Sequence, residues 1–288
     1  MRGLLLGFTL AVLGGALTAS ARGEFMFSTG DPDGLMAAAS RPAGPGILEI
    51  ETGDDFILDH RTRITSASFT GLVSPTADLN QIDNVVVEIY RIFPLDSVDP
   101  PSGNVPSRVN SPSDVAFATR EAAAATLSFS TTVLNASFTA ANSVLNGINK
   151  VPNQTTGGGG QVIGEEIRFD VALTDPLELA AGRYFFVPQV QMADGAGDFY
   201  WLSAGTPILP DLQAWIRNAN LSPDWLRIGT DIVGGTSPPR FNMAFSLAGR
   251  VVPEPASVTM MGIAGVAIAG FAVRRRPRPS PTPQPKLR

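Results

Sequence analysis

Two residue types are almost missing from this chain of 288 residues, which holds no cysteine and a single histidine, His60. Without cysteine the protein cannot form disulfides, cysteine-ligated zinc sites or thiol nucleophiles. One histidine excludes a metal site built from several histidines. A Ser-His-Asp triad would have to use His60, although the sequence has no Gly-x-Ser-x-Gly motif. We therefore interpret His60, which follows Asp59, as an ordinary loop residue.

Charged residues are also scarce, at 16 %, whereas glycine (29) and proline (24) are abundant and 44 % of residues are hydrophobic. Glycine and proline form turns and interrupt helices, and this hydrophobic content is too high for a disordered chain. The composition predicts a loop-rich, all-β globular protein. Because disulfides are excluded, its fold must be stabilised by core burial, which a chain of this length allows.

The amino terminus has the pattern of a secretory signal peptide. Arg2 provides a positive charge, and residues 4–17 are an apolar run that is too short to span a bilayer comfortably. Ala19 and Ala21 then form the small-residue pattern that signal peptidase recognises. We predict cleavage by signal peptidase after Ala21. The alternative is an uncleaved amino-terminal anchor.

A second apolar segment lies near the carboxyl terminus, where Pro253, Glu254 and Pro255 precede the uncharged residues 256–273. As a helix this segment would be about 27 Å long, which only just covers a hydrocarbon core of about 30 Å. Basic residues follow it: Arg274, Arg275 and Arg276. Their charge holds that end on the cytoplasmic side. The pattern predicts a marginal transmembrane helix with a stop signal.

This order of parts resembles the PEP-CTERM sorting signal of bacteria that produce exopolysaccharide. The resemblance implies that an exosortase recognises the chain during a transient stay in the inner membrane and cleaves it near the Pro-Glu-Pro motif. It also implies delivery to the cell surface or extracellular matrix of a Gram-negative bacterium. An ordinary carboxy-terminal anchor is the alternative. Such signals usually stop at the arginines, whereas residues 277–288 continue here as a proline-rich tail that excludes helix and strand.

The chain thus divides into a signal peptide (1–21), an ectodomain (22–251), a sorting signal (252–276) and a disordered tail (277–288). The ectodomain has 14 basic and 25 acidic side chains, which gives a net charge near −11. Such a surface repels nucleic acid and anionic lipid headgroups and tolerates divalent cations. We expect no nucleic-acid partner.

Alternation of apolar and polar residues with a period of two dominates the ectodomain. In residues 165–173, for example, Ile167, Phe169 and Val171 fall on one face and Arg168 falls on the other. Many such strands without long helices between them predict an antiparallel β-sandwich, jelly-roll-like in type, with one or two short helices. The strand candidates are residues 47–51, 63–70, 83–93, 126–138, 165–173, 183–192, 198–203 and 240–249.

Two segments have a helical pattern instead. In residues 210–220, Leu212, Trp215 and Ile216 have the spacing of one helical face, and residues 113–125 are a second, less regular candidate. These segments supply the short helices of the predicted fold.

One strand candidate carries a conflicting signal. Residues 183–192 are apolar on both faces at first, as in a buried strand. Pro188 within it cannot donate a ladder hydrogen bond, which predicts a sheet edge or a bulge at this point.

Several ectodomain blocks, among them FSTGDPDGLMAAASRP, VEIYRIFPLDS and NLSPDWLRIGTDIVGGT, resemble a family of uncharacterised bacterial proteins that carry the same sorting tail. The resemblance covers most of residues 27–247. It implies a shared β-sandwich fold, and it brings no established activity that could be transferred.

Acidic pairs in two loops are the candidate metal ligands, and calcium is the one cofactor that they suggest. Asp31 and Asp33 stand two apart before a glycine, as at the start of a calcium-binding loop, and Asp194 and Asp198 flank a glycine-containing turn. The first pair lacks the third acid and the distal glutamate of that pattern. An Asx turn at the first pair and a solvated hairpin tip at the second are the alternatives.

Aromatic residues could provide a platform for sugars. We consider Trp201 and Trp225 as candidates for carbohydrate stacking, with use in the core as the alternative. No recognisable pair of catalytic carboxylates accompanies them, because Glu165 and Glu166 are adjacent and face opposite ways on a strand.

Two classes of function remain. The sequence favours a non-enzymatic cell-surface or matrix protein whose acidic sandwich associates with exopolysaccharide or other surface proteins. The alternative is a secreted polysaccharide-active hydrolase or a lectin-like carbohydrate-binding module. A cleft that holds two acids at hydrolase separation beside Trp201 or Trp225 would favour the alternative.

Overall fold

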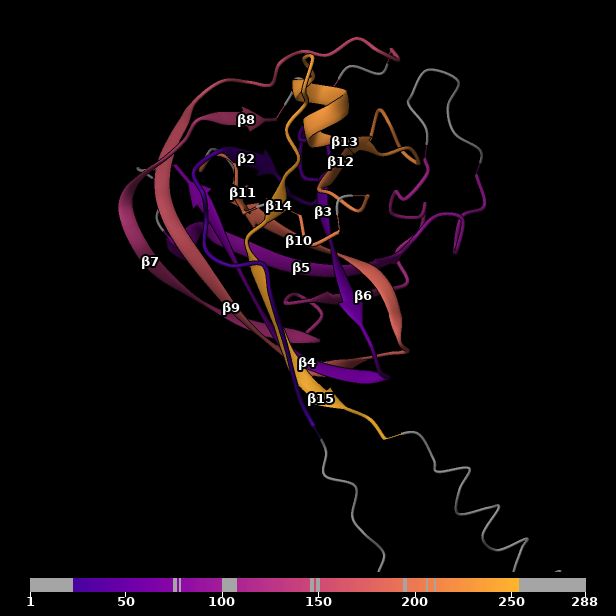
Figure 1. Ribbon diagram of the computed structural model, residues 1–288. Coiled ribbons are helices and arrows are strands. Elements are labelled where there is room, and N and C mark those ends of the chain that lie inside the picture. The colour runs from indigo at the N-terminus through magenta and orange to yellow at the C-terminus, as the bar shows by residue number, and fades with distance from the viewer. Residues whose placement is uncertain are drawn as a thin grey trace, which may run out of the picture. The chain divides into compact units, whose positions relative to one another are not determined.

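Two β-sheets make up the folded part of the protein, as the period-two pattern predicts (Figure 1). The computed structural model describes residues 23–253 apart from 75, 76, 78, 100–107, 146, 147, 149, 150, 194, 195, 206 and 210. Among these residues every strand pair is antiparallel except that of β2 with β8. The all-β, antiparallel fold class is therefore confirmed.

Sheet 1 has nine strands, arranged around β4, which pairs with β9, β11 and β15. Its strands are β1 (Glu24–Ser28), β2 (Met36–Ala39), β4 (Thr62–Val73), β7 (Leu127–Ala140), β8 (Asn142–Val144), β9 (Val162–Leu179), β11 (Tyr200–Ala204), β14 (Asn242–Met243) and β15 (Phe245–Val251).

Sheet 2 has six strands in the order β13-β12-β3-β10-β5-β6. They are β3 (Ile50–Leu58), β5 (Ile82–Arg91), β6 (Ala118–Glu121), β10 (Gly182–Met192), β12 (Trp215–Asn218) and β13 (Leu226–Arg227). Two short helical turns complete the described elements, the 3₁₀ helix η1 (Leu79–Gln81) and the π-helix η2 (Ile228–Val233).

The main core lies between the two sheets and is rich in aromatic rings. Phe186 of sheet 2 stacks on Phe245 of sheet 1 with 5.1 Å between ring centroids, and Phe69 stacks on Phe169 at 4.8 Å. The buried positions alternate along β9, where Phe169 is fully buried and Arg168 is exposed. Burial of such rings is the main source of stability for a protein that has no disulfide.

Sheet 2 is covered on its outer face as well, by loops and turns that pack over β10 and β12. A second, smaller core forms there, made of Tyr90, Phe185, Val187, Leu212, Trp215 and Trp225. This explains why β10 is apolar on both faces, since seven consecutive residues of it are buried.

Strand β10 is internal, between β3 and β5, but at Pro188 it pairs with β5 alone, so the predicted edge holds locally, and the only register shift in its pairing with β5 lies between Gln191 and Met192. Pairing with β3 ends at Phe186, two residues before the proline. Beyond that point the carbonyl of Pro188 accepts a hydrogen bond from the Ser40 hydroxyl at 2.5 Å. The missing N–H therefore costs no ladder bond.

The two predicted helices, at residues 210–220 and 113–125, are wrong. Residues 215–218 of the first form β12, in which Trp215 packs on the outer core and Ile216 on the main core. A segment buried on both sides is apolar at consecutive positions, and this imitated helical spacing. The second segment contains β6, which pairs with β5, followed by a turn at residues 122–125.

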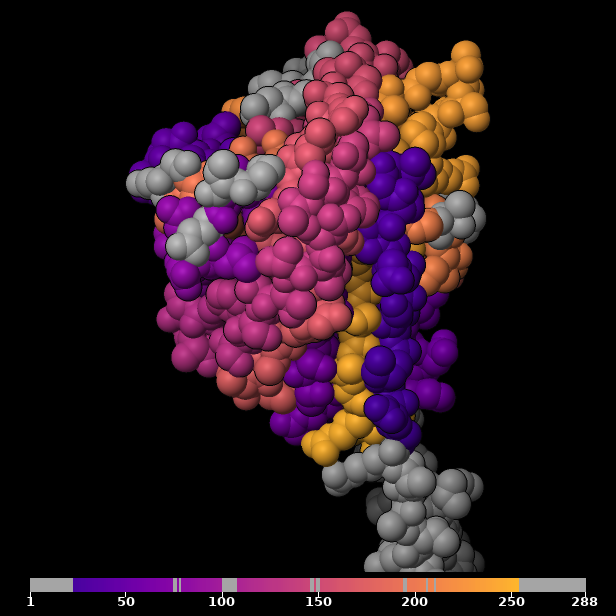
Figure 2. Space-filling view, turned by 90° about the vertical axis from the view of Figure 1, so that its left-hand side faces the viewer, coloured from indigo at the N-terminus to yellow at the C-terminus, as the bar shows by residue number. Residues whose placement is uncertain are grey.

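The first and last strands of the sandwich, β1 and β15, lie side by side. β1 pairs with β15 from Glu24↔Arg250 to Ser28↔Ser246, and the Val251 N–H donates to the Gly23 carbonyl at 2.9 Å. In Figure 1 both strands run to the lower end of the sandwich, while η2 lies at the upper end. Figure 2 shows β1 and β15 together along one side, next to the broad outer surface of β7 and β9.

Candidate functional site

The loop after β1 contains the first pair of candidate metal ligands. The carboxylate of Asp33 accepts hydrogen bonds from the Leu35 N–H at 3.0 Å and from the Ser203 hydroxyl at 2.5 Å. The first bond is that of an Asx turn, which the sequence left open as the alternative. Asp31 in the same loop is exposed. The turn, rather than a calcium loop, accounts for the geometry at Asp33.

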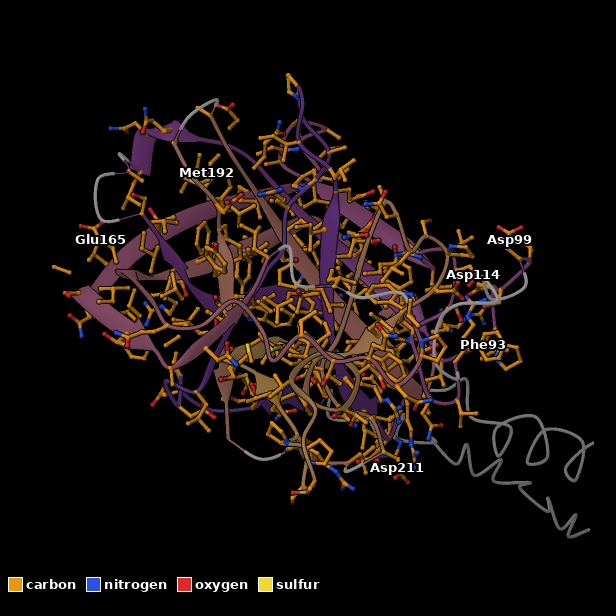
Figure 3. All side chains as sticks on the ribbon, turned by 90° about the horizontal axis from the view of Figure 1, so that it is seen from above. Phe93, Asp99, Asp114, Glu165, Met192 and Asp211 are labelled. Atoms are coloured by element: carbon orange, nitrogen blue, oxygen red, sulfur yellow. The ribbon has the colours of Figure 1, made fainter. Side chains whose placement is uncertain are left out.

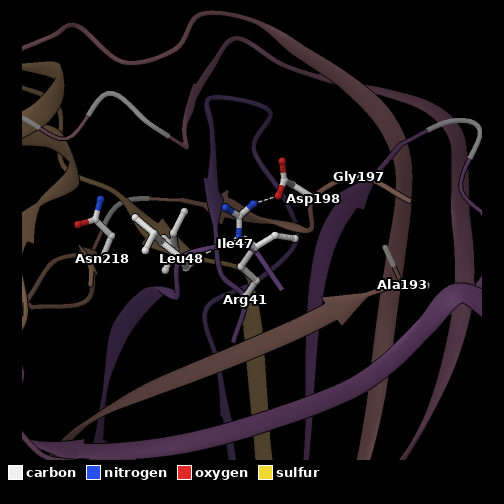
Figure 4. A pocket seen from close by; sticks show the side chains of 9 residues that line it. Arg41, Ile47, Leu48, Ala193, Gly197, Asp198 and Asn218 are labelled. Atoms are coloured by element: carbon white, nitrogen blue, oxygen red, sulfur yellow. Dashed lines mark hydrogen bonds and ion pairs between the residues drawn. The ribbon is translucent and has the colours of Figure 1, made fainter. Parts of the chain in front are cut away.

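The second pair cannot be assembled, since Asp194 lies outside the described residues. Asp198 forms an ion pair with Arg41 in a cleft of about 500 Å³, whose wall includes Ile47 and Leu48 (Figure 4). Burial lowers the pKa of Arg41. Because Arg41 already neutralises Asp198, this cleft is a poor calcium site. Across the described part of the chain, no three acidic or histidine side chains gather into a possible metal site.

Both tryptophans proposed to stack on sugars are completely buried, with 0 % of their surface exposed. The indole of Trp201 donates to the Ala244 carbonyl at 2.9 Å, and that of Trp225 donates to the Ser113 carbonyl at 3.0 Å. The stacking prediction is therefore wrong, and the alternative of core packing holds. An indole ring that is buried in the core and donates its N–H to a backbone carbonyl has no exposed face on which a sugar could stack.

A buried polar network lies on the outer face of sheet 2 beside the smaller core. The Arg217 guanidinium is paired with the Glu51 carboxylate, donates to the Tyr90 hydroxyl at 3.0 Å, and lies 4.5 Å from the centroid of the Trp225 ring. Arg217 and Glu51 face each other in the register of β12 and β3. Arg217 is 6 % exposed and Glu51 is 4 % exposed.

The same network brings two carboxylates together. The Tyr90 hydroxyl lies 2.5 Å from a carboxylate oxygen of Glu51 and 3.2 Å from one of Glu88. Burial, with a further contribution from the negative charge of Glu51, raises the pKa of Glu88 to about 7. Two carboxyl groups in reach of one hydroxyl could serve acid–base chemistry. Glu51 is nevertheless closed off from solvent by Arg217 and Tyr90.

A larger cleft, of about 770 Å³, opens beside β13 and η2; we call it the polar cleft. Its walls come from the turn at Asn110, the segment that leads into β12, and the loop after η2. Gly229 shapes it, because a Cβ there would lie 1.9 Å from the Pro239 carbonyl, so only glycine lets the loop fold back onto η2. Polar groups dominate the lining: Asn110, Asp211, Gln213, Arg227, Thr230, Thr236, Ser237 and Arg240.

The sequence did not single out the residues of the polar cleft. They come from four stretches of the chain, between residues 109 and 240, that look like ordinary turns and loops. In Figure 3, Asp211 lies at the lower edge of the view, whereas Asp99 and Asp114 lie at its right-hand edge. The one available signal was the concentration of hydroxyl residues and Arg240 after η2.

His60 lies in the exposed turn between β3 and β4, where its carbonyl accepts a hydrogen bond from the Thr62 hydroxyl. This agrees with the interpretation as a loop residue. Glu165 and Glu166 are neighbours on β9, as expected.

The remaining predicted residues concern export and sorting, and nearly all lie outside the described residues: Ala19, Ala21, Glu254, Pro255, Arg274, Arg275 and Arg276. The predicted span 256–273 lies outside them too. Strand β15 ends at Val251, two residues before Pro253, the last residue described. A family model described as the PEP-CTERM protein-sorting motif matches residues 251–276. The chain carries a PEP-CTERM sorting signal.

The PEP-CTERM signal makes this an exported protein that an exosortase sorts during membrane transit. No curated protein and no solved structure matches the chain. Within the described range, none of the helical segments has the length and hydrophobicity needed to cross a bilayer.

Proposed function

We propose that the PEP-CTERM protein is a non-enzymatic component of the cell surface or extracellular matrix of a Gram-negative bacterium, where its acidic ectodomain associates with exopolysaccharide. Signal peptidase removes the leader after Ala21, and exosortase processing near Pro253 releases the sandwich from the inner membrane. On this proposal the signal peptide and the sorting signal are removed in turn, and the ectodomain is the mature product.

The pairing of β1 with β15 is the observation that carries this proposal. It places both attachment points, Gly23 and Val251, at one end of the sandwich. The strand ends at Val73 and Ser28 then lie at the opposite end, with the polar cleft on that side beside η2. Both processing points thus lie at one end of the module, and the loops at the opposite end stay clear of them and are free for binding.

Fractionation of the producing bacterium tests the proposal. We expect immunoblots to find the chain in the surface or matrix fraction at the mass of the processed ectodomain. A variant with Arg274, Arg275 and Arg276 replaced by Asn should lose the band at the mass of the processed ectodomain, because without the charged stop the marginal span is no longer held across the membrane for the exosortase. Arg278→Asn in the tail is the matched control and should behave like the wild type. Full-length chain in the cytosol with its leader attached would contradict the proposal.

The Glu51–Glu88 pair supports hydrolysis of matrix polysaccharide as a second candidate function. Two arguments weigh against it: Glu51 is 4 % exposed, and Trp225 beside the network is fully buried. We expect no reducing sugar to be released from matrix polysaccharide by the exported protein. Release that disappears in Glu88→Gln and persists in the surface variant Glu178→Gln would favour the hydrolase instead.

A further inference from the structure

We propose that the polar cleft is a saccharide-binding site that takes its ligand through sugar hydroxyl groups. The proposal rests on the proposed function for the source of the ligand, the matrix polysaccharide. The volume of the polar cleft, about 770 Å³, lies within the usual range for ligand sites, about 300–1,000 Å³. Four of its side chains, Asp211, Gln213, Arg227 and Arg240, define the chemistry of the ligand.

Gln213 is the first indication of a missing partner. It is 5 % exposed, and its Oε1 atom is buried with no hydrogen-bond partner among the described residues. An unsatisfied buried amide oxygen costs about 1–3 kcal/mol, so natural proteins seldom retain one without a reason. The Oε1 atom is closed to solvent, so a ligand hydroxyl reaches it only when the amide turns toward the polar cleft; a hydroxyl can then pair with either end of the amide, because it both donates and accepts.

Arg227 presents a fixed guanidinium. Its Nε and Nη2 atoms donate to the two carboxylate oxygens of Asp231 at 2.9 and 2.8 Å, and the guanidinium lies 5.9 Å from the centroid of the Trp215 ring. The hydrogen bonds from Arg227 to Asp231 raise the pKa of Arg227, so it stays a cation. Its Nη1 atom has no partner among the described residues. An arginine held in this way loses little side-chain entropy when it binds a ligand.

Asp211 and Arg240 are exposed at the mouth of the polar cleft. Neither forms an ion pair within the part of the chain that the structure describes. They differ in this from Arg41 and Asp198, which neutralise each other in the smaller cleft. An unpaired acceptor and an unpaired donor therefore face the same space.

This mixture of donors and acceptors selects the ligand class. A metal ion requires acceptors alone, and a phosphate or sulfate group requires donors alone. Vicinal hydroxyls of a sugar offer both, and the hydroxyl side chains of Thr230, Thr236 and Ser237 extend the same pattern along the cleft. No aromatic ring is among the described residues that line the polar cleft, which points to binding by hydrogen bonds rather than by stacking.

Affinity electrophoresis of the purified exported protein tests this site. The gels contain dextran as a neutral probe, alginate as a uronate probe, dextran sulfate as an ionic probe, or polysaccharide extracted from the producing bacterium. Asp211→Ala and Arg240→Ala are the test variants, since both residues are exposed and their loss spares the core. Asp59→Ala and Arg250→Ala are the controls, since they remove exposed charges elsewhere on the protein.

We expect dextran, alginate or the extracted polysaccharide to retard the wild type and both control variants. Asp211→Ala and Arg240→Ala should weaken the apparent affinity at least tenfold with an unchanged melting temperature. Equal retardation of all variants, retardation by dextran sulfate alone, or no retardation in any gel would each overturn the proposal. Fractionation still reports the surface location in those cases, so failure of this site is distinguishable from failure of the proposed function.

Discussion

At the scale of single residues, the outer layer of sheet 2 depends on buried arginines. Arg217 is paired with Glu51, and Arg108 is paired with Asp114, with all four side chains almost fully enclosed. Taking such charges out of water costs several kcal/mol per ion, which is recovered only when each charge keeps its partner. These arginines fasten the loop after β5 and the turn before β13 to the sheet through the backbone carbonyls of Asp114 and Pro223.

Replacement of Arg217 by leucine should destabilise the protein by about 3–5 kcal/mol, because Glu51 is then left buried without a counter-charge. Urea unfolding of the exported protein measures the change. Arg168→Leu is the matched control: its pair with Asp170 is about half exposed, so its loss should cost at most about 1 kcal/mol. Similar costs for the two substitutions would show that the buried network is not needed.

At the scale of elements, β4 is the strand on which sheet 1 is assembled, with β9 on one side and β15 and β11 on the other. Gly71 near its end is packed under the Phe199 ring. A Cβ at Gly71 would lie 2.2 Å from that ring, far inside any permitted contact. The glycine thus lets the aromatic core close against β4.

Gly71→Ala should therefore cost about 1–3 kcal/mol through overpacking. Thermal unfolding followed by circular dichroism measures it. Gly205→Ala, at an exposed bend where an added Cβ meets nothing within 4 Å, should leave the melting temperature nearly unchanged. A Gly71→Ala protein as stable as the wild type would mean that both the Phe199 ring and the Tyr200 carbonyl, 2.5 Å from the added Cβ, can move aside freely.

At the scale of the whole molecule, buried acids make stability depend on pH. Burial is the main cause that raises the pKa of Asp54, Asp55 and Glu88, that of Glu88 to about 7. The folded protein keeps protons that the unfolded chain releases near the ordinary values of 3.8 for Asp and 4.5 for Glu. The contribution of these groups to stability is complete below those values and is lost as pH rises towards 7.

We expect the melting temperature at pH 5 to exceed that at pH 8, as differential scanning calorimetry would report. The double variant Asp55→Asn/Glu88→Gln should reduce this difference, because two of the titrating groups are gone. Asp59→Asn, at an exposed turn, serves as the control and should retain it. A melting temperature that rises from pH 5 to pH 8 would contradict the proposed role of the buried acids.

The sequence by itself determined the sheets and the sorting signal. Alternation along β9 and β4 is local information, since successive side chains of a strand face opposite ways whatever the partner strand is. The Pro-Glu-Pro motif and the three arginines after the span are equally local. Patterns that depend only on residues close together in the sequence can be recognised without the tertiary structure.

Only the tertiary structure decided which residues meet. The strand at Trp215 has the apolar spacing of a helix because it packs against a core on each side. Trp201 and Trp225 are buried in these cores, so they are not available to bind a ligand at the surface. Asn110, Gln213 and Arg240 line one cleft although loops far apart in the chain supply them. Long-range packing fixes such contacts, and no local pattern encodes them, because each loop is compatible with many positions until the sheets pair.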